Sequence, residues 1–486
     1  MNLPLPTQSY QSRSKPFSSQ RLLNLIIDKS ADNATQSKYM LIGAPGLELL
    51  ALGTNTNPVL GMMFLHNYLI IATALGIYVE YLVGGVLNMI TSKTWAELEL
   101  ENPSSGDIQM ASSGDDIIVL NRNATEDGRG RMVIVTGNSP VASEWTIDFP
   151  TVEGEGFPDY TSVVCISGVF VASCQIGSDS YVQFTDVLAT NFQYAFQLDT
   201  ALNNLKGLAS NMREVWAFSP NSIEVLAPTG ETGNDFFAHV QGAYLNKGCK
   251  YRDSIATYET SFLFYGTDDV IYITNSYEPK PISTPAIHDM IASWGPINNI
   301  IGQVFSVGGH QFYQLKFKGP NKTLWFDLTI GSWLERETGD GGEWLGEYII
   351  RGQDGELIVS SVSTAALYRM NMLYYTDVGQ PIVKEFVFPT LESEDKKRMY
   401  YYSLTLDVDM GLAPNDTDVV QLCWSDDGGY TWGPWRSLPL LDGVYNKKLQ
   451  FRRLGSSMQR TYRVKTITNS KLNIIRAMMD AEEGQV

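Results

Sequence analysis

The chain has 486 residues with 44% hydrophobic and 11% aromatic content, 42 glycines and 21 prolines, which favours an all-β protein and, at this length, a barrel or a propeller. Its four cysteines form no CxxC pair and its four histidines no HExxH or HxH pattern, so we expect neither a disulfide framework nor a metal centre, and no cofactor. The formal net charge of −18 argues against tight nucleic-acid binding, because phosphate-binding surfaces are basic.

Residues 1–58 are expected to form an N-terminal arm. Within it, RLLNLIID (21–28) is strand-like and is expected to close a propeller by joining its last blade. The polar start of the chain does not resemble a signal peptide. The apolar stretch YLIIATALGIYV (68–79) has 12 residues, whereas a membrane-spanning helix needs about 20. A buried strand, turn and strand explains this stretch better, so we expect no membrane insertion.

Between residues 59 and 375 one pattern recurs, in which a short strand is followed by a Gly, Asn or Asp turn and a strongly apolar strand. Its seven copies begin at residues 59, 107, 162, 205, 252, 303 and 346, about 48 residues apart on average. A period of about 40–50 residues is typical of propeller blades, which must stack around an axis because each has two apolar faces. We predict six or seven blades, since one copy could be an irregular insertion. Helical periodicity is limited to short stretches at 284–295 and 95–101.

Residues 376–486 depart from this pattern and read as the antiparallel strands of a small C-terminal β-sandwich. The charge changes at the same place. Residues 389–486 hold 13 basic and 13 acidic side chains, so residues 1–388 carry the entire −18. We therefore expect three parts, which are the arm and closing strand (1–58), the propeller (59–375) and the sandwich (376–486).

The stretch SDDGGYTW (425–432) fits the Asp-box of sialidase-like propellers through Ser425, Asp427, Gly429 and Trp432. Such a box is turn chemistry, because its Ser and Asp side chains accept hydrogen bonds from nearby backbone N–H groups. It occurs once, outside the repeats. A calcium loop would need Glu at its twelfth position, which is occupied here by Ser437 or Leu438. We therefore interpret the box as a structural turn.

Catalytic residues are not indicated. Glycosidase chemistry needs two carboxylates across a cleft, and sialidases add three arginines. Five arginines of the propeller part, Arg213, Arg252, Arg336, Arg351 and Arg369, stand at unrelated positions of the repeats.

Lys447, Lys448, Arg452 and Arg453 form a basic cluster, with Arg460, Arg463 and Lys465 nearby. On alternating strand positions such side chains usually face solvent. The alternative is that the cluster contacts an acidic surface of a partner protein.

An ordered series of segments resembles the packaged DNA stabilisation proteins, or tail accessory factors, of short-tailed phages, and the nozzle proteins of other podoviruses. The resemblance covers about residues 20 to 476. It is carried by LLNLIID (22–28), GAPGLELLA (43–51), REVWAFSPNSIEVLAPTG (213–230), GAYLNKGCKYRDSIATYETSFLFYG (242–266), YEPKPISTPAIHDMI (277–291), GHQFYQLKF (309–317), CWSDDGGYTW (423–432) and RRLG (452–455).

The resemblance implies a structural virion protein rather than an enzyme. Members of this family form a hexameric tail hub or nozzle below the portal and its adaptor ring, extend the DNA channel, retain the packaged genome and pass it during ejection. The implied partners are five further copies, the portal–adaptor ring, the tail needle or plug and the tail fibres or spikes. The implied location is the phage tail of the virion, after assembly in the host cytoplasm.

Two hypotheses follow. The acidic part of the chain would let double-stranded DNA slide through the ring without tight binding. We also expect the loops 121–130 and 151–160, or the C-terminal module, to lie at subunit interfaces. The alternative function is a carbohydrate-active or receptor-binding propeller, favoured by the Asp-box and the many aromatic residues.

Overall fold

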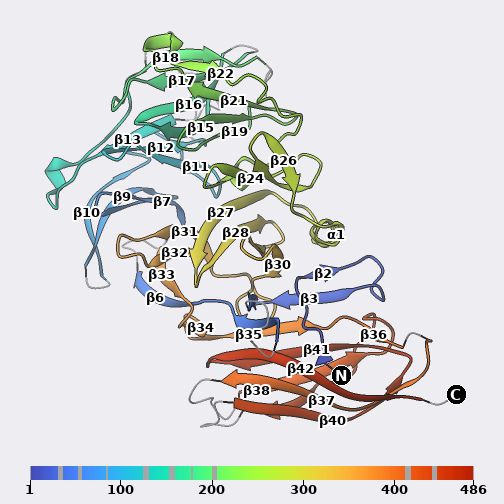
Figure 1. Ribbon diagram of the computed structural model, residues 1–486. Helices are drawn as coiled ribbons and strands as arrows, with labels where there is room; N and C mark the ends of the chain where they lie inside the picture. The colour runs from blue at the N-terminus through green and yellow to red at the C-terminus, as the bar shows by residue number, and fades with distance from the viewer. Residues whose placement is uncertain are drawn as a thin grey trace.

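A computed structural model describes residues 2–30, 37–52, 57–83, 86–123, 131–152, 159–176, 179–199, 205–393, 395–410, 418–440 and 446–484. Figure 1 shows two parts, a ring of β-sheets and, below it, a pair of packed sheets that contains the C-terminal strands. The chain is all-β, with one α-helix among the described residues.

The ring consists of seven four-stranded antiparallel sheets. The first four blades are β7–β10 (Val59–Leu65, Tyr68–Thr73, Gly76–Val83, Val86–Thr94), β11–β14 (Ile108–Ser112, Asp116–Asn121, Arg131–Thr136, Thr146–Asp148), β15–β18 (Asp159–Ile166, Val169–Ile176, Asp179–Thr185, Phe192–Gln197) and β19–β22 (Gly207–Ser210, Val215–Phe218, Ile223–Pro228, Phe237–His239). The others are β23–β26 (Ala256–Tyr258, Ser261–Tyr265, Ile271–Asn275, Glu278–Pro281), β27–β30 (Asn299–Val307, His310–Lys318, Lys322–Asp327, Ser332–Glu335) and β31–β33 (Gly346–Arg351, Leu357–Ser361, Ala366–Asn371) with β6 (Gly46–Leu52).

The first strands of the blades surround the axis and contact one another in order, and β31 contacts β7 to close the ring. Seven hydrophobic clusters of described residues fill the spaces between neighbouring blades, and the one between blades 6 and 7 extends into the sandwich. Burial on both faces explains the continuous apolar runs of the second strands, such as β8, in which all six residues are buried. The described residues thus form a seven-bladed propeller, within the predicted range.

The strand that closes the propeller is not the one expected from the sequence. The outer strand of blade 7 is β6, which pairs antiparallel with β33 from Gly46↔Asn371 to Leu52↔Ala366. The segment 21–28 is divided at Asn24, whose φ of 55° belongs to the left-handed region. Its first part, β3 (Ser19–Leu23), pairs with β35 (Gln380–Val387), and its second, β4 (Leu25–Lys29), pairs with β5 (Tyr39–Gly43).

Two sheets form the sandwich, and the N-terminal arm contributes to it. One sheet has the order β4-β5-β42-β37-β40, with β1 (Asn2–Leu3) added on β42 (Leu472–Glu483). The other contains β35, β36 (Leu391–Glu392), β38 (Val419–Ser425), β39 (Arg436–Pro439) and β41 (Gln459–Thr468). The remaining strands are β37 (Met399–Met410), β40 (Asn446–Ser457), β34 (Thr376–Asp377) and β2 (Tyr10–Gln11), which pairs with β3.

The helix α1 (Pro285–Ser293) lies where the sequence predicts one. Thr284 caps it by accepting a hydrogen bond from the Ile287 N–H, and Pro285 starts it. The stretch 95–101 forms hydrogen-bonded turns instead of a helix. The apolar stretch 68–79 forms β8 and the beginning of β9, and no helix in the described part of the chain is long and apolar enough to cross a membrane.

Candidate functional site

A cavity of about 450 Å³ lies on the propeller axis, between the first strands of the blades. Arg252 is one of the residues that line it. Its guanidinium donates hydrogen bonds to the backbone oxygens of Thr161 (2.8 Å) in blade 3 and Gly106 (3.0 Å) before blade 2. Its stem lies against Gly207 of blade 4, where an added Cβ would lie 2.5 Å from the Arg252 Cγ. One side chain from the start of blade 5 therefore ties four blades together.

Other ionic groups surround Arg252. Asp253 accepts from Arg252 Nε (2.7 Å) and from Asn299 Nδ2 (2.7 Å), and Arg122 lies 3.7 Å from its carboxylate. Burial, and after it the neighbouring Arg252, lowers the pKa of Arg122 to about 10. Since all three nitrogens of the Arg252 guanidinium already donate to protein oxygens, this cluster is built to hold the axis closed rather than to receive a ligand.

Hydrogen bonds also cross between blades along the cavity wall. Gln109 Oε1 in blade 2 accepts from Ser162 Oγ (2.8 Å) and the Val163 N–H (3.1 Å) in blade 3, and Ser162 Oγ accepts from the Leu208 N–H (2.9 Å) in blade 4. These side-chain bonds connect blade 2 to blade 3 and blade 3 to blade 4.

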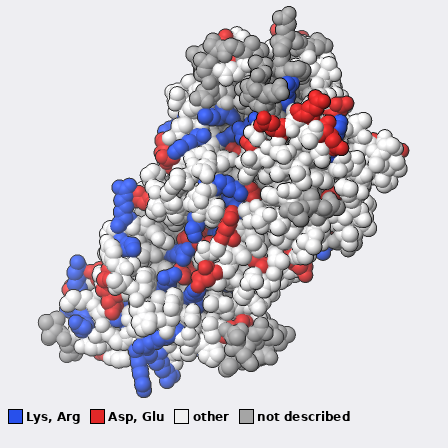
Figure 2. Space-filling view, turned by 180° about the vertical axis from the view of Figure 1, so that it is seen from behind, with Lys and Arg blue, Asp and Glu red and all other residues white. Residues whose placement is uncertain are grey.

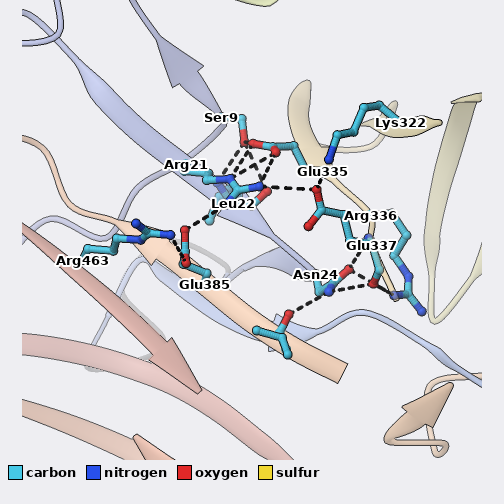
Figure 3. Close-up of polar contacts among 11 residues, drawn as sticks. Ser9, Arg21, Leu22, Asn24, Lys322, Glu335, Arg336, Glu337, Glu385 and Arg463 are labelled. Atoms are coloured by element: carbon cyan, nitrogen blue, oxygen red, sulfur yellow. Dashed lines mark hydrogen bonds and ion pairs between the residues drawn. The ribbon is translucent and has the colours of Figure 1, made fainter. Parts of the chain in front are cut away.

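An ion-pair network joins the propeller to the sandwich (Figure 3). Arg21 on β3 binds Glu335 of blade 6 through Nε (3.0 Å) and Nη2 (2.6 Å), and Glu385 on β35 through Nη1 (3.0 Å). Arg463 on β41 binds the other oxygen of Glu385 at 2.5 Å. Although burial alone would lower it, the pKa of Arg21 is raised by Glu335 and Glu385. The network thus links the propeller, the arm and two neighbouring strands, β35 and β41, of one sandwich sheet.

Beside this network Asn24 acts as a second connection. Its Nδ2 donates to the backbone oxygens of Glu337 (3.0 Å) and Val383 (2.7 Å), and its Oδ1 accepts from Arg336 Nη1 (3.1 Å). The same position in the left-handed region that divides the predicted strand therefore places a buried amide between propeller and sandwich.

The Asp-box lies in the turn after β38. Ser425 Oγ accepts from the Gly429 N–H (2.7 Å), and the Asp427 carboxylate accepts from the Tyr430 and Thr431 N–H groups (both 2.9 Å) and from Thr431 Oγ1 (2.6 Å). The Ser425 hydroxyl also donates to Asp427 Oδ1 (2.6 Å), and this bond, followed by those from Thr431 and Tyr430, holds the pKa of Asp427 well below its ordinary value. Gly428 and Gly429 have φ of 78° and 98°.

The rest of the box faces neighbouring segments. Asp426 binds Arg460 through two bonds (2.5 and 2.7 Å), and Trp432 lies over Arg463 with 5.6 Å between ring centroid and guanidinium. A Cβ on Gly428 would lie 2.7 Å from Pro16, so the turn packs directly against the N-terminal arm.

The basic cluster predicted from the sequence separates onto two sheets. Lys448, Arg452 and Arg453 are exposed on β40, the edge strand of its sheet, and no carboxylate of the described residues lies within 4 Å of them. The side chain of Lys447 lies outside the described structure. Arg460, Arg463 and Lys465 are on β41 in the other sheet and pair with Asp426, Glu385 and Asp340. In Figure 2, Lys and Arg lie on both the sandwich and the propeller, and a group of Asp and Glu lies on the propeller.

Of the two loops expected at interfaces, residues 124–130 and 153–158 lie outside the described residues. Among the residues that are described, no three His, Cys, Asp or Glu side chains gather as a metal site requires. All four cysteines are free thiols, and burial raises the pKa of Cys174, Cys249 and Cys423 to about 12.

Sequence reasoning did not identify Arg21, Asn24, Arg252 or Glu385 as key residues. Arg21 and Glu335 are separated by 314 positions in the chain, and Arg252 and Gly106 by 146, so no local pattern connects them. The only available signal was a charged side chain within an apolar strand, as for Lys384 and Glu385 in β35.

Two models of one protein family match the chain. The β-propeller of bacteriophage P22 Gp10 matches residues 81–372, and the β-sandwich of the same protein matches residues 385–482. The chain belongs to the bacteriophage P22 Gp10 family. This membership confirms the resemblance to a podovirus tail protein, and with the strand topology it confirms the predicted fold class, a β-propeller followed by a β-sandwich.

Several solved structures are similar to part of the chain at low sequence identity. A search of curated proteins gives no match. Among solved structures, the WD40 propeller of Doa1 covers 67% of this chain and 97% of its own, with 10% identity and a TM-score of 0.40. The Pan2 WD40 domain of Neurospora crassa covers 65% and 89% with 11% identity and a TM-score of 0.40, and BamB from Moraxella catarrhalis covers 71% and 98% with 9% identity and a TM-score of 0.38.

Proposed function

We propose that this phage tail protein is one subunit of a hexameric hub or nozzle ring below the portal–adaptor. The ring extends the DNA channel, retains the packaged genome and passes it during ejection. The observation that carries the proposal is the match of both Gp10 modules, in order, over most of the chain. The protein acts as a structural part of the virion tail and not as an enzyme, after assembly in the host cytoplasm.

The contact between the propeller and the sandwich, which we call the joint and which centres on Arg21, Glu335, Glu337 and Glu385, supports this role. A ring that bears the pressure of packaged DNA has to transmit force between its modules without a hinge. Arg21, Glu335 and Glu385 connect propeller and sandwich through several charge-assisted hydrogen bonds in a buried setting. We divide the chain accordingly into the arm (1–58), the propeller (59–375) and the sandwich (376–486), with β6 of the arm completing blade 7.

The charge distribution supports passage of DNA without tight binding. Residues 1–388 carry the whole net charge of −18, and non-specific DNA affinity depends on Lys and Arg neutralising phosphates. If propeller surfaces line the ring, double-stranded DNA is repelled from the wall and can slide.

Mixing the purified protein with a portal–adaptor complex tests the ring. Electron microscopy and light scattering are expected to give six copies per complex, even where the protein alone is monomeric. The needle or plug and the fibre or spike proteins should then bind to the completed ring. A protein that ignores the complex, or that adds in another stoichiometry, contradicts the proposal.

Electrophoretic mobility shifts with duplex DNA at physiological salt test the channel. We expect no tight complex of the free protein. The carbohydrate alternative is not favoured, because the Asp427 carboxylate and the Ser425 hydroxyl are both occupied by bonds within the turn. Retention of glycans by the protein would instead support the carbohydrate-binding alternative.

A further inference from the structure

A groove of about 550 Å³ lies where the arm, α1 and the Asp-box turn meet. The hairpin β2–β3 forms one wall, and Gly429 and Trp432 of the box form another. Its position beside the joint brings together three segments that are far apart in the sequence.

The charge of this groove has the opposite sign to that of the chain. Its lining includes five cations (Arg13, Lys15, Arg21, Lys322, Arg463) and three carboxylates (Asp289, Glu335, Glu385). Four of the five cations already pair with carboxylates: Arg21 with Glu335, Lys322 with Glu337, Arg463 with Glu385 and Arg13 with Asp289. Lys15 is exposed, lies 5.3 Å from the centre of the Tyr430 ring, and has no carboxylate within 4 Å among the described residues. The cation of the groove that has no carboxylate partner among the described residues is therefore Lys15, on the arm.

Two polar atoms within the groove lack partners. Ser19 Oγ and Arg463 Nε are buried and have no hydrogen-bond partner in the described structure. Arg463 is held between the indole rings of Trp432 (5.6 Å) and Trp435 (5.3 Å). A buried donor without an acceptor costs free energy in the folded protein.

Exposed aromatic side chains surround the same place. Phe17 at the tip of the hairpin is 74% exposed, Tyr430 57% and Trp435 37%. Arginine and large aromatic residues are the side chains in which protein interfaces concentrate their binding energy.

We infer that this groove is a docking site for an extended acidic segment of a partner protein that also carries apolar residues. Carboxylates of the segment would pair with Lys15 and compete with Asp289 for the exposed Arg13, while apolar side chains would cover Phe17 and Tyr430. A duplex DNA fits less well, because Asp289, Glu335 and Glu385 would lie close to its phosphates.

The inference goes beyond the proposed ring, and its test needs neither a hexamer nor the portal–adaptor complex. The probe is a fluorescein-labelled octapeptide of alternating glutamate and leucine, followed by fluorescence anisotropy with the full-length protein. The comparison probes are the lysine–leucine octapeptide and a 20-base-pair duplex. We expect the acidic peptide to bind at least about tenfold more tightly than either, and to weaken as salt rises.

Variants locate the binding. Arg13→Glu with Lys15→Glu should weaken the acidic peptide at least about tenfold. The matched control is Lys448→Glu with Arg452→Glu, which makes the same change of charge on the exposed strand β40 and should alter binding less than about twofold. All four side chains are exposed, so both variants should keep the wild-type circular dichroism spectrum and melting temperature.

Three results would overturn the inference. They are an absence of acidic-peptide binding, an equal loss in both double variants, and tighter binding of the duplex than of the peptide. The last would identify the groove as a nucleic-acid site. Because ring formation is measured separately, a failure here leaves the proposed hub intact, and a failed ring leaves the groove testable.

Discussion

Arg336 and Asp377 form an ion pair that is completely withdrawn from water, with 2.7 Å between Nη2 and Oδ1 and both side chains 0% exposed. Arg336 follows the last strand of blade 6, and Asp377 lies on β34, which pairs with β6 and β35. The guanidinium also donates to the Pro45 oxygen (3.0 Å) and lies over Trp325 and Trp344. The pair therefore fixes the strand that closes the propeller next to the strand that leads into the sandwich.

Removal of one partner from this pair should be costly. Asp377→Ala leaves the Arg336 charge buried without a counter-ion, so we expect a loss of about 3–5 kcal/mol in the free energy of unfolding. The double variant Arg336→Met with Asp377→Leu should lose less, because no charge remains buried. Denaturant unfolding measures both.

The control for this prediction is the Arg13–Asp289 pair, whose distance is 2.6 Å but whose side chains are 80% and 20% exposed. Arg13→Ala should cost less than about 1 kcal/mol, since solvent screens such pairs. Equal effects of Asp377→Ala and Arg13→Ala would show that burial does not set the energy of the joint.

Replacement of the axial arginine should weaken the propeller as a whole. Arg252→Ala leaves the oxygens of Thr161 and Gly106 without their donor and opens space beside Gly207, so we expect a loss of about 3 kcal/mol. Arg213→Ala, on an exposed turn of blade 4, should change stability by less than about 0.5 kcal/mol. Calorimetry compares the two variants. A melting temperature unchanged by Arg252→Ala would contradict the role of Arg252 in tying the blades together.

The sequence indicates the blades because their signal is local. The seven predicted starts lie within four residues of the first strands at 59, 108, 159, 207, 256, 299 and 346. Each blade is built from neighbouring hairpins whose turns and apolar alternation can be read within a window of about 50 residues.

The strand that closes the propeller could not be predicted in the same way. Both 21–28 and 46–52 are short apolar segments, and nothing local tells which sheet each one joins. The choice depends on Asn24, which turns the chain in the left-handed conformation that Asn tolerates better than most residues, and on pairing with strands more than 300 residues away. The groove was not found for the same reason, since its cations come from the arm, from β29 and from β41.

The turn of the Asp-box should depend on one carboxylate. Asp427→Ala removes the acceptor of the Tyr430 and Thr431 N–H groups, so we expect amide hydrogen exchange in residues 428–435 to become at least several-fold faster. The control is Asp395→Ala, whose side chain is 69% exposed and pairs only with Lys397 among the described residues. Unchanged exchange in the Asp427 variant would mean that the glycines alone set the turn.

The same bonds predict that the turn becomes less stable in acid. The folded pKa of Asp427 is depressed, so its contribution to stability is present above the ordinary carboxyl pKa and is lost as the pH falls through the folded value. Wild type should therefore lose the slow exchange of residues 428–435 in acid, whereas Asp427→Ala should show little further change. A variant that responds to acid as strongly as wild type would assign the response to other carboxylates.

Two buried lysines should behave differently when replaced. Burial lowers the pKa of both Lys384 and Lys316 to about 8. Lys316 Nζ donates to the backbone oxygens of Trp344 (3.0 Å) and Gly346 (2.8 Å), whereas Lys384 Nζ has no hydrogen-bond partner among the described residues. Lys384→Met should therefore stabilise the protein at pH 7 by up to about 3 kcal/mol, the free energy that corresponds to its pKa shift.

The depressed pKa of Lys384 also determines whether stability rises or falls with pH. Between about pH 8 and pH 10.5 the unfolded chain holds a proton on Lys384 that the folded protein has released, so wild-type stability rises across this window. Lys384→Met should lose its share of that rise. Lys316→Met should be less stable than Lys384→Met by about 2 kcal/mol, because two carbonyl oxygens lose their donor. Denaturant unfolding at pH 7 and pH 10 measures these differences in stability. A Lys384→Met variant that is less stable than wild type at pH 7 would show that the wild-type Lys384 ammonium has favourable partners in the folded protein.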